Sequence, residues 1–253
     1  MHELRLPTDP PDGDHTALPP HPLERPGRNI AQDPARGAWP EFFAGALVTV
    51  SAAPILHSVP CVGYVVDERP VPGKMDPKKY VPALRRTGTP MSAMSALQRG
   101  ESVTLADGTV LRGPARQPGR RIVVLGDTYD PSPIAELAED ACLLIHEATN
   151  AHLPGVDPNT KKEDTYEGVE ARAKSRGHST PQMAGAFATS IRAGKLVLNH
   201  FSARYPGNDD VDEDAKRTMD AIRGLAESTY EGEVVCARDL MSFDVAPRKE
   251  PGI

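Results

Sequence analysis

The sequence is poor in cysteine, in aromatic side chains and in long apolar runs. Its 253 residues include only three cysteines, which lie far apart: Cys61, Cys142 and Cys236. An odd, widely spaced set excludes a disulfide-stapled scaffold and a cysteine-based zinc finger. It favours a reducing, intracellular compartment, either the cytoplasm or the nucleus, with the mitochondrion as an alternative. No apolar run approaches the roughly 20 residues of a membrane helix, so we expect no membrane span. The first ten residues lack the apolar core of a secretory signal.

Charge is unevenly distributed along the chain. The whole sequence carries a formal charge of −6, yet the stretch from Arg69 to Arg121 holds 11 basic and three acidic residues, a local balance of +8. The remainder therefore carries −14. A basic segment on an acidic body can bind a polyanion. An ordinary solvated, lysine-rich loop is the alternative interpretation.

The pattern of prolines and apolar residues divides the chain into five parts. Residues 1–40 hold nine of the 26 prolines and are expected to form an extended or disordered lead-in. Short β-like runs follow in 41–68, then an inserted basic arm in 69–121 that contains a hairpin around Gly108. Strands and helices alternate over 122–244, which predicts an α/β architecture, and 245–253 is a tail. Within this part we expect helices over Ser132–Asp140, Pro181–Ala193 and Asp210–Ser228, and a loop over 150–177.

Polar side chains that suit metal binding or acid–base chemistry stand where successive strands are expected to end. Asp127 follows one strand, His146 and Glu147 end the next, and His200 ends a third. Ligands collect beyond the carboxyl ends of strands in α/β sheets, so these residues are predicted to face one crevice. His178, just before a helix that Ser179 or Thr180 can cap, and His57, after an apolar run, are expected to join them. Such a set suits Zn²⁺ or Mn²⁺, whereas each residue alone could equally be structural.

Six literal strings, in order along the chain, resemble the motifs of the ribonuclease Z family. They are His57-Ser58-Val59-Pro60-Cys61-Val62-Gly63-Tyr64, Pro72-Gly73-Lys74, Gly126-Asp127-Thr128, Leu144-Ile145-His146-Glu147-Ala148-Thr149, Gly177-His178-Ser179-Thr180 and Leu198-Asn199-His200-Phe201-Ser202-Ala203-Arg204-Tyr205. The family consists of tRNA 3′-end processing endoribonucleases, which are zinc-dependent hydrolases. The resemblance covers residues 45–206, and more loosely extends to 244. It implies the C-terminal part of a metallo-β-lactamase-like αββα sandwich with an inserted basic arm.

The resemblance also implies roles for individual residues. His57, Asp127 and His200 match metal ligands of a two-zinc site, and Glu147 with His178 matches the pair that moves a proton to the leaving group. The basic arm matches the exosite that grips the tRNA, with Lys74, Lys78, Lys79, Arg85 and Arg86 as its expected RNA-binding residues. Precursor tRNA is therefore the expected substrate, and a homodimer the expected assembly.

One family motif, His-x-His-x-Asp-His, does not occur in this sequence. The nearest string, Asp12-Gly13-Asp14-His15, lacks the preceding pair of histidines, and neither His2 nor His21 has a spacing that replaces them. We therefore expect the chain to be an incomplete enzyme that is inactive alone. Two alternatives are a non-catalytic tRNA-binding or partner subunit, and a metallo-β-lactamase-fold hydrolase of a small ester or phosphodiester.

Overall fold

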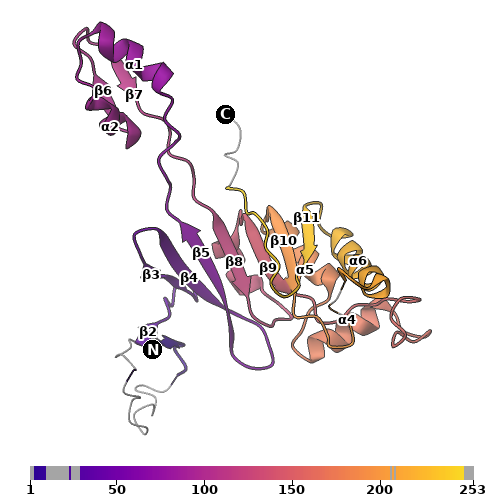
Figure 1. The fold of residues 1–253 in the computed structure, drawn as a ribbon. Helices are drawn as coiled ribbons and strands as arrows, with labels where there is room; N and C mark the ends of the chain where they lie inside the picture. The colour runs from indigo at the N-terminus through magenta and orange to yellow at the C-terminus, as the bar shows by residue number, and fades with distance from the viewer. Residues whose placement is uncertain (1–2, 10–22, 24–28, 206, 208, 248–253) are drawn as a thin grey trace.

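The structure is a computed structural model that describes residues 3–9, 23, 29–205, 207 and 209–247. His2, the string Asp12–His15 and His21 lie outside these residues, as does most of the expected C-terminal tail. A seven-stranded mixed sheet forms the centre, in the order β11-β10-β9-β8-β5-β4-β3 (Figure 1). The predicted α/β class is thereby confirmed. None of the helices in the described part of the chain combines the length and apolar character that crossing a membrane requires.

One half of the sheet is antiparallel and the other half is parallel. Strands β3 (Trp39–Ala44), β4 (Val48–Ile55), β5 (Cys61–Glu68) and β8 (Arg121–Leu125) pair antiparallel in succession. Strands β9 (Leu143–Glu147), β10 (Lys195–Asn199) and β11 (Glu233–Cys236) then continue from β8 in parallel. Because β8 to β11 all point the same way, their carboxyl ends meet at one edge.

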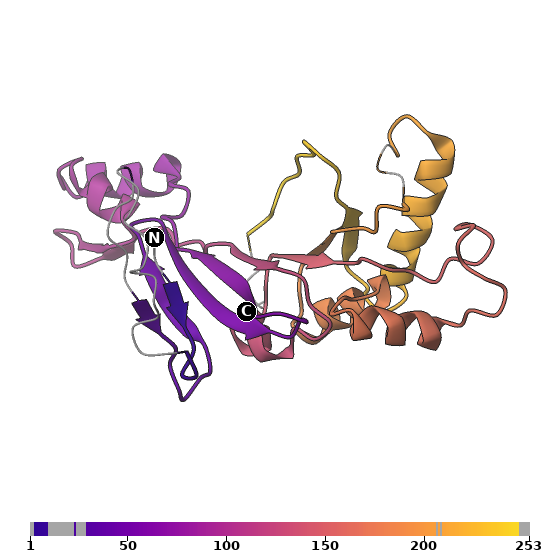
Figure 2. The same cartoon turned by 90° about the horizontal axis from the view of Figure 1, so that it is seen from below.

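Helices cover one face of this sheet. They are η2 (Ser132–Ile134), α3 (Ala135–Ala138), α4 (Tyr166–Ser175), α5 (Pro181–Ser190) and α6 (Glu213–Glu227). Alternate strand residues such as Val123, Leu144 and Leu196 form the core with Phe187 and Ile222. These side chains are at most 8% exposed, and their burial is the main stabilising contribution. Figure 2 shows α4, α5 and α6 gathered around the β9–β11 half of the sheet.

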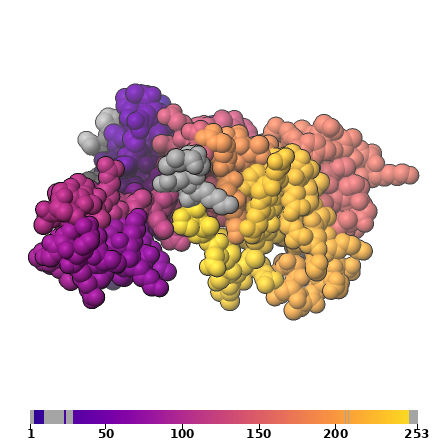
Figure 3. Space-filling model, turned by 90° about the horizontal axis from the view of Figure 1, so that it is seen from above, coloured from indigo at the N-terminus to yellow at the C-terminus, as the bar shows by residue number. Residues whose placement is uncertain are grey.

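The basic segment forms a small lobe that stands away from the sheet (Figure 1). In the space-filling view from above it is a compact purple-to-magenta mass (Figure 3). It contains α1 (Pro77–Arg86), α2 (Ala93–Gln98), β6 (Ser102–Thr104) and β7 (Val110–Arg112). The expected hairpin is confirmed, since β6 pairs antiparallel with β7, whereas the two helices were not predicted. The lobe has its own apolar centre of Tyr80, Leu84, Leu97 and Leu105, each at most 3% exposed.

Three sequence expectations about helices prove wrong in detail. The segment 150–177, expected to be a loop, contains α4, whose first turn is capped by Thr165. The helix expected to start with Ser132 as its cap is a 3-10 turn preceded by Pro131, and only Ala135–Ala138 is α-helical. The helix expected to reach Ala193 ends at Ser190. The left-handed residue just beyond that end is Arg192 (φ +53°), whose guanidinium donates hydrogen bonds to Asp140.

Two strands differ from their expected positions near the start of the chain. The lead-in contains a short parallel pair of strands, β1 (Glu3–Arg5) and β2 (Asn29–Ala31). Local sequence patterns did not predict this pair, because the two strands are far apart in the sequence. The apolar run expected before His57 is the end of β4, which stops at Ile55, and His57 itself lies in a bend. His57 is therefore a turn residue, free to point away from the sheet.

Candidate active site

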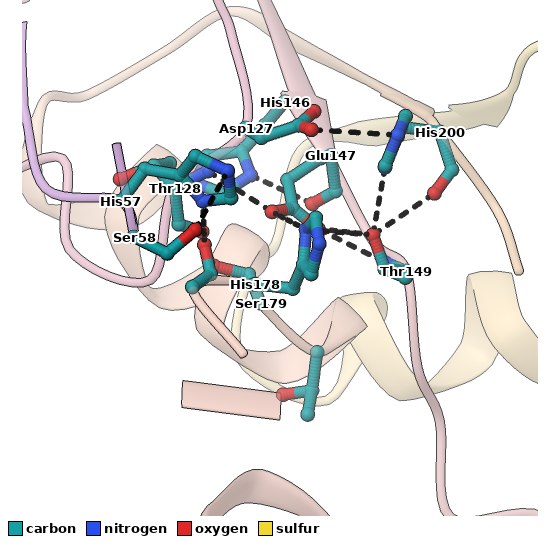
Figure 4. Close-up of polar contacts among 12 residues, drawn as sticks. His57, Ser58, Asp127, Thr128, His146, Glu147, Thr149, His178, Ser179 and His200 are labelled. Atoms are coloured by element: carbon teal, nitrogen blue, oxygen red, sulfur yellow. Dashed lines mark hydrogen bonds and ion pairs between the residues drawn. The ribbon is translucent and has the colours of Figure 1, made fainter. Parts of the chain in front are cut away.

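Five side chains that the sequence singled out lie together beyond the carboxyl ends of the parallel strands (Figure 4). Asp127 follows β8, Glu147 ends β9 and His200 follows β10. His57 comes from the turn after β4, and His178 from the loop between α4 and α5. The parallel strands bring these chain segments to the same edge of the sheet, so the five side chains gather there.

Hydroxyl groups tie the loops of this site to one another. The Thr128 hydroxyl donates a hydrogen bond to the Leu56 carbonyl (2.9 Å), and the Ser179 hydroxyl donates one to the Thr128 carbonyl (2.6 Å). Both side chains are fully buried. The loops that carry His57, Asp127 and His178 are thus held in fixed relative positions.

The Glu147 carboxylate is buried, at 1% exposure, and accepts four hydrogen bonds. Its Oε1 accepts from the Thr128 backbone N–H (3.0 Å) and from His178 Nδ1 (2.9 Å). Its Oε2 accepts from the backbone N–H (3.1 Å) and the hydroxyl (2.6 Å) of Thr149. Four acceptor sites are all that a carboxylate has, so Glu147 orients its neighbours and does not face the open site.

His178 lies at the centre of the cluster. Its ring stacks on His200 with centroids 5.3 Å apart, and lies 5.1 Å from the ring of His57. Since Nδ1 donates to Glu147, the Nε2 atom is left on the other edge of the ring.

His57 is fixed by an unusual neighbour. Its Nδ1 lies 2.7 Å from the carbonyl oxygen of Gly177 and donates to it. Gly177 has φ +86°, and a Cβ at that position would lie 2.3 Å from His57 Nδ1. Only glycine combines this left-handed backbone with such a close approach. Gly177 therefore positions His57 through its carbonyl oxygen, and the next residue, His178, is itself part of the site.

His200 and Asp127 form the exposed side of the cluster. Asp127 Oδ2 lies 3.5 Å from His200 Nε2, and the side chains are 35% and 48% exposed. His200 Nδ1 lies 2.8 Å from the hydroxyl of Thr149. All three histidines therefore bind an oxygen through Nδ1, which leaves Nε2 on the opposite edge of each ring. The Nε2 of His57 also lies 3.4 Å from the hydroxyl of Ser58, an exposed contact that a ligand can replace.

The donor atoms present suit a divalent cation. Potential ligand atoms lie within 4.8 Å of one another in two groups, His57 with Asp127 and His178, and Glu147 with His178 and His200. Imidazole and carboxylate donors are typical of Zn²⁺ and Mn²⁺ sites, and histidine ligands are usually oriented by a bond on their second nitrogen, as here. The trio expected from the family resemblance, His57, Asp127 and His200, is not one of these two groups, so that assignment stays a prediction.

Two other histidines lie outside the cluster. His146 is fully buried on the helix-covered face, with its ring 6.0 Å from Phe187, because side chains alternate along β9 and Glu147 takes the other side. The expectation that His146 and Glu147 face one crevice is therefore wrong for His146. His152 Nε2 lies 3.0 Å from the carbonyl oxygen of Asp164.

The sequence is similar to curated bacterial ribonucleases Z and BN. The chain is 36% identical over 208 residues to ribonuclease Z from Prochlorococcus marinus (strain MIT 9303), covering 79% of this chain and 57% of the relative. It is 35% identical over 235 residues to ribonuclease Z from Synechococcus sp. (strain WH7803), covering 89% and 64%. Ribonuclease BN from Cronobacter sakazakii is 34% identical over 163 residues, covering 62% and 47%. The chain is a homologue of ribonuclease Z. It spans about three fifths of the length of these ribonuclease Z relatives, and no family model matches it.

Two solved structures are similar to the chain. The short form of human tRNase Z matches at 25% identity and a TM-score of 0.49, covering 97% of this chain and 56% of that one. A metallo-β-lactamase fold protein from Bacillus subtilis matches at 19% identity and a TM-score of 0.42, covering 84% and 54%.

Two residues that orient the site histidines of this ribonuclease Z homologue were not assigned a role from the sequence. Thr149 and Gly177 lie within the family-like strings, yet only their spatial neighbours reveal what they do. In the sequence only their positions point to such a role: Thr149 stands two residues after Glu147, and Gly177 directly precedes His178.

The expected RNA-binding residues Lys74, Lys78, Lys79, Arg85 and Arg86 all lie exposed in the basic lobe. Lys78 and Lys79 occupy the first turn of α1, where cations oppose the helix dipole, so helix stability does not explain them. Arg86 pairs with Asp107 at 2.8 Å. Among the described residues, no acidic partner is recorded for the other four.

Proposed function

We propose that this chain is the C-terminal part of a metal-dependent endoribonuclease that removes 3′ trailers from precursor tRNA. The observation that carries the proposal is the convergence of His57, Asp127, Glu147, His178 and His200 at one edge of the sheet in a homologue of ribonuclease Z. His57, Asp127 and His200 would hold zinc. The bound metal would polarise the phosphate and lower the pKa of a bound water.

The chain's own residues would bind the substrate and move a proton. Glu147 holds His178 Nδ1 at 2.9 Å, so that Nε2 faces the open site. With both ring nitrogens protonated, His178 would give its Nε2 proton to the leaving 3′ oxygen as the bond between that oxygen and the phosphorus breaks and water adds to the phosphorus; Glu147 would hold the ring in the required orientation and the phosphate would stay on the trailer. The product would be a tRNA with a 3′-hydroxyl and a separate trailer.

The site in this chain is incomplete for a two-metal reaction. Three histidines and two carboxylates gather, and the Glu147 carboxylate already accepts four hydrogen bonds from neighbouring residues. Two metals need more ligands than these. We therefore propose that the isolated chain cleaves precursor tRNA at a negligible rate and that further ligands restore cleavage.

An experiment with a fused chain tests this proposal. The purified chain with Zn²⁺ is assayed on a precursor tRNA, alone and fused to the N-terminal part of the Synechococcus relative. We expect cleavage only from the fusion, with a loss of at least about 100-fold on Asp127→Asn because the site loses a charged ligand. The matched control is Glu136→Gln, an exposed carboxylate on α3. A fusion that binds zinc but never cleaves would refute the proposal, and cleavage by the isolated chain would refute its second part.

The basic lobe would hold the tRNA through its phosphates. Charge reversal at Lys78 and Lys79 is expected to weaken tRNA binding, because each lysine that no longer neutralises a phosphate lowers the slope of log K against log salt by about one. The matched control is Lys161 and Lys162, another exposed adjacent pair, in the loop before α4. An unchanged salt slope in the lobe variant, measured by fluorescence anisotropy, would exclude the lobe as the binding surface. We also propose a homodimer, supported by the family resemblance and tested by sedimentation velocity.

A further inference from the structure

The hydroxyl of Thr149 occupies a junction between the buried and exposed parts of the site (Figure 4). Its Oγ1 lies 2.6 Å from Glu147 Oε2 and 2.8 Å from His200 Nδ1. Two further neighbours are more distant, the His200 carbonyl oxygen at 3.1 Å and His178 Nδ1 at 3.4 Å. One small side chain thus touches three of the five site residues.

The bonding capacity of a hydroxyl decides which atom donates. A hydroxyl has one proton and two lone pairs, and its shortest contact is to a carboxylate, the strongest acceptor present. The proton of Thr149 therefore goes to Glu147. A lone pair of the same oxygen then faces His200 Nδ1, which must carry a proton to make that bond. In this arrangement Nε2 of His200 is unprotonated, and it is the atom that faces Asp127.

Apart from Thr149, the His200 ring stacks on the ring of His178 and lies 3.5 Å from Asp127 through Nε2, so Thr149 provides the contact to its Nδ1. The side chain is 48% exposed, and no other oxygen contact to its Nδ1 is recorded among the described residues. Its backbone has φ +52°, a left-handed conformation that a non-glycine residue adopts only when its surroundings require it. Those surroundings include Thr149, whose carbonyl oxygen accepts a hydrogen bond from the Ser202 backbone N–H at 3.0 Å.

We infer that Thr149 is a positioning residue that carries the orientation of buried Glu147 outward to His200. It selects the His200 tautomer with the proton on Nδ1 and turns Nε2 toward Asp127. The consequence for metal affinity rests on the proposed function, in which His200 is a ligand. The tautomer itself does not depend on that function.

The test is the tautomer of His200 in the metal-free chain. Long-range ¹H–¹⁵N spectra are recorded at about pH 8, where histidine is ordinarily neutral, and the His200 signals are assigned with His200→Gln. We expect the Nδ1-protonated form to dominate in the wild type and in Thr149→Ser, which keeps the hydroxyl. Thr149→Val, which keeps the shape but not the hydroxyl, is expected to give a mixture of both tautomers. Thr149→Ala provides the same test should the valine variant not fold.

A second measurement follows zinc affinity by calorimetry. Removing a group that orients a ligand typically costs 10- to 100-fold in affinity, and we expect such a loss in Thr149→Val with recovery in Thr149→Ser. Thr160→Val, in the same loop but away from the site, is the matched control. An unchanged His200 tautomer in both Thr149→Val and Thr149→Ala would overturn the inference. A changed tautomer in a chain whose fusion never cleaves tRNA would leave the inference in place and refute only the proposed function.

Discussion

At the scale of single residues, the site depends on how each histidine uses Nδ1. His57 binds the carbonyl oxygen of Gly177, His178 binds Glu147, and His200 binds the hydroxyl of Thr149. These bonds orient the three imidazole rings in the chain without a ligand, which lowers the conformational entropy lost when a ligand binds. His146, the residue before Glu147, differs from these three: its Nε2 is buried and finds no hydrogen-bond partner among the described residues.

Burial of His146 predicts a pH-dependent stability. Burial is the largest effect on this group and lowers the pKa of His146 below its ordinary value of 6.5. The folded chain therefore keeps the ring neutral, while the unfolded chain takes up a proton below pH 6.5. Its contribution to the free energy of unfolding is present above pH 6.5 and falls by about 1.4 kcal/mol per pH unit below it, until the folded-state pKa is reached.

Urea unfolding at about pH 8 and pH 5.5 measures this effect. The wild type is expected to lose more stability between the two pH values than His146→Gln, which cannot titrate. His152→Gln, a partly exposed position, is the matched control. An equal loss of stability in the wild type and in His146→Gln would contradict the prediction.

At the scale of elements, the basic lobe folds around side chains of its own. Tyr80 and Leu84 of α1, Leu97 of α2 and Leu105 beside the hairpin are all nearly inaccessible to solvent. Two chain segments connect the lobe to the sheet, bridged by the pair Val71 and Gln117. The basic surface is therefore carried on a packed scaffold and not on a loose loop, which limits the entropy lost when a polyanion binds.

The lobe is expected to unfold without the sheet. Leu84→Ala leaves a cavity in its small centre and removes about 2–5 kcal/mol of local stability, enough to open so small a unit. Amide hydrogen exchange should then speed up in α1, β6 and β7 but not in β8 or β9. The reciprocal variant Leu144→Ala is expected to affect the sheet and spare the lobe. Loss of protection in both parts from either variant would show that they unfold together.

At the scale of the whole molecule, the helices of the described residues pack on one face of the sheet. On the other face a row of in-register residues crosses the sheet, namely Ala52, Tyr64, Val124, Ile145, Val197 and Val235. Tyr64 and Val124, in the middle of the sheet, are 38% and 37% exposed. Ala52 and Val197 of the same row are buried, at 0% and 2% exposure. Among the described residues, the middle of the row is therefore the part open to further packing, consistent with a chain that spans about three fifths of its ribonuclease Z relatives.

Two adjacent valines of β8 distinguish the faces. Val123→Thr places a hydroxyl among the helices and is expected to cost about 1–3 kcal/mol, because that site is fully buried. Val124→Thr should change the free energy of unfolding by less than about 0.5 kcal/mol in the isolated chain. Equal losses at the two positions in urea titrations would mean that the open face is covered in solution.

The sequence by itself determined the α/β class and the family resemblance, and it named the five residues that gather in the candidate site. Those follow from short-range patterns: apolar runs that end in polar residues, and literal strings around His57, Asp127, Glu147, His178 and His200. Spacing could not tell that α4 lies within 150–177, because its apolar periodicity is weak and Thr165 caps it through a single hydroxyl contact to the Gly168 backbone.

Only the tertiary structure decided which neighbours share a function. His146 and Glu147 are adjacent in sequence, yet the alternation of a strand buries one among helices and turns the other to the site. Thr149 and His200 are 51 residues apart and meet because β9 and β10 are parallel neighbours. Hydrogen bonds act over about 3 Å in space, so the partners of a side chain are set by the packing of strands and not by distance along the chain.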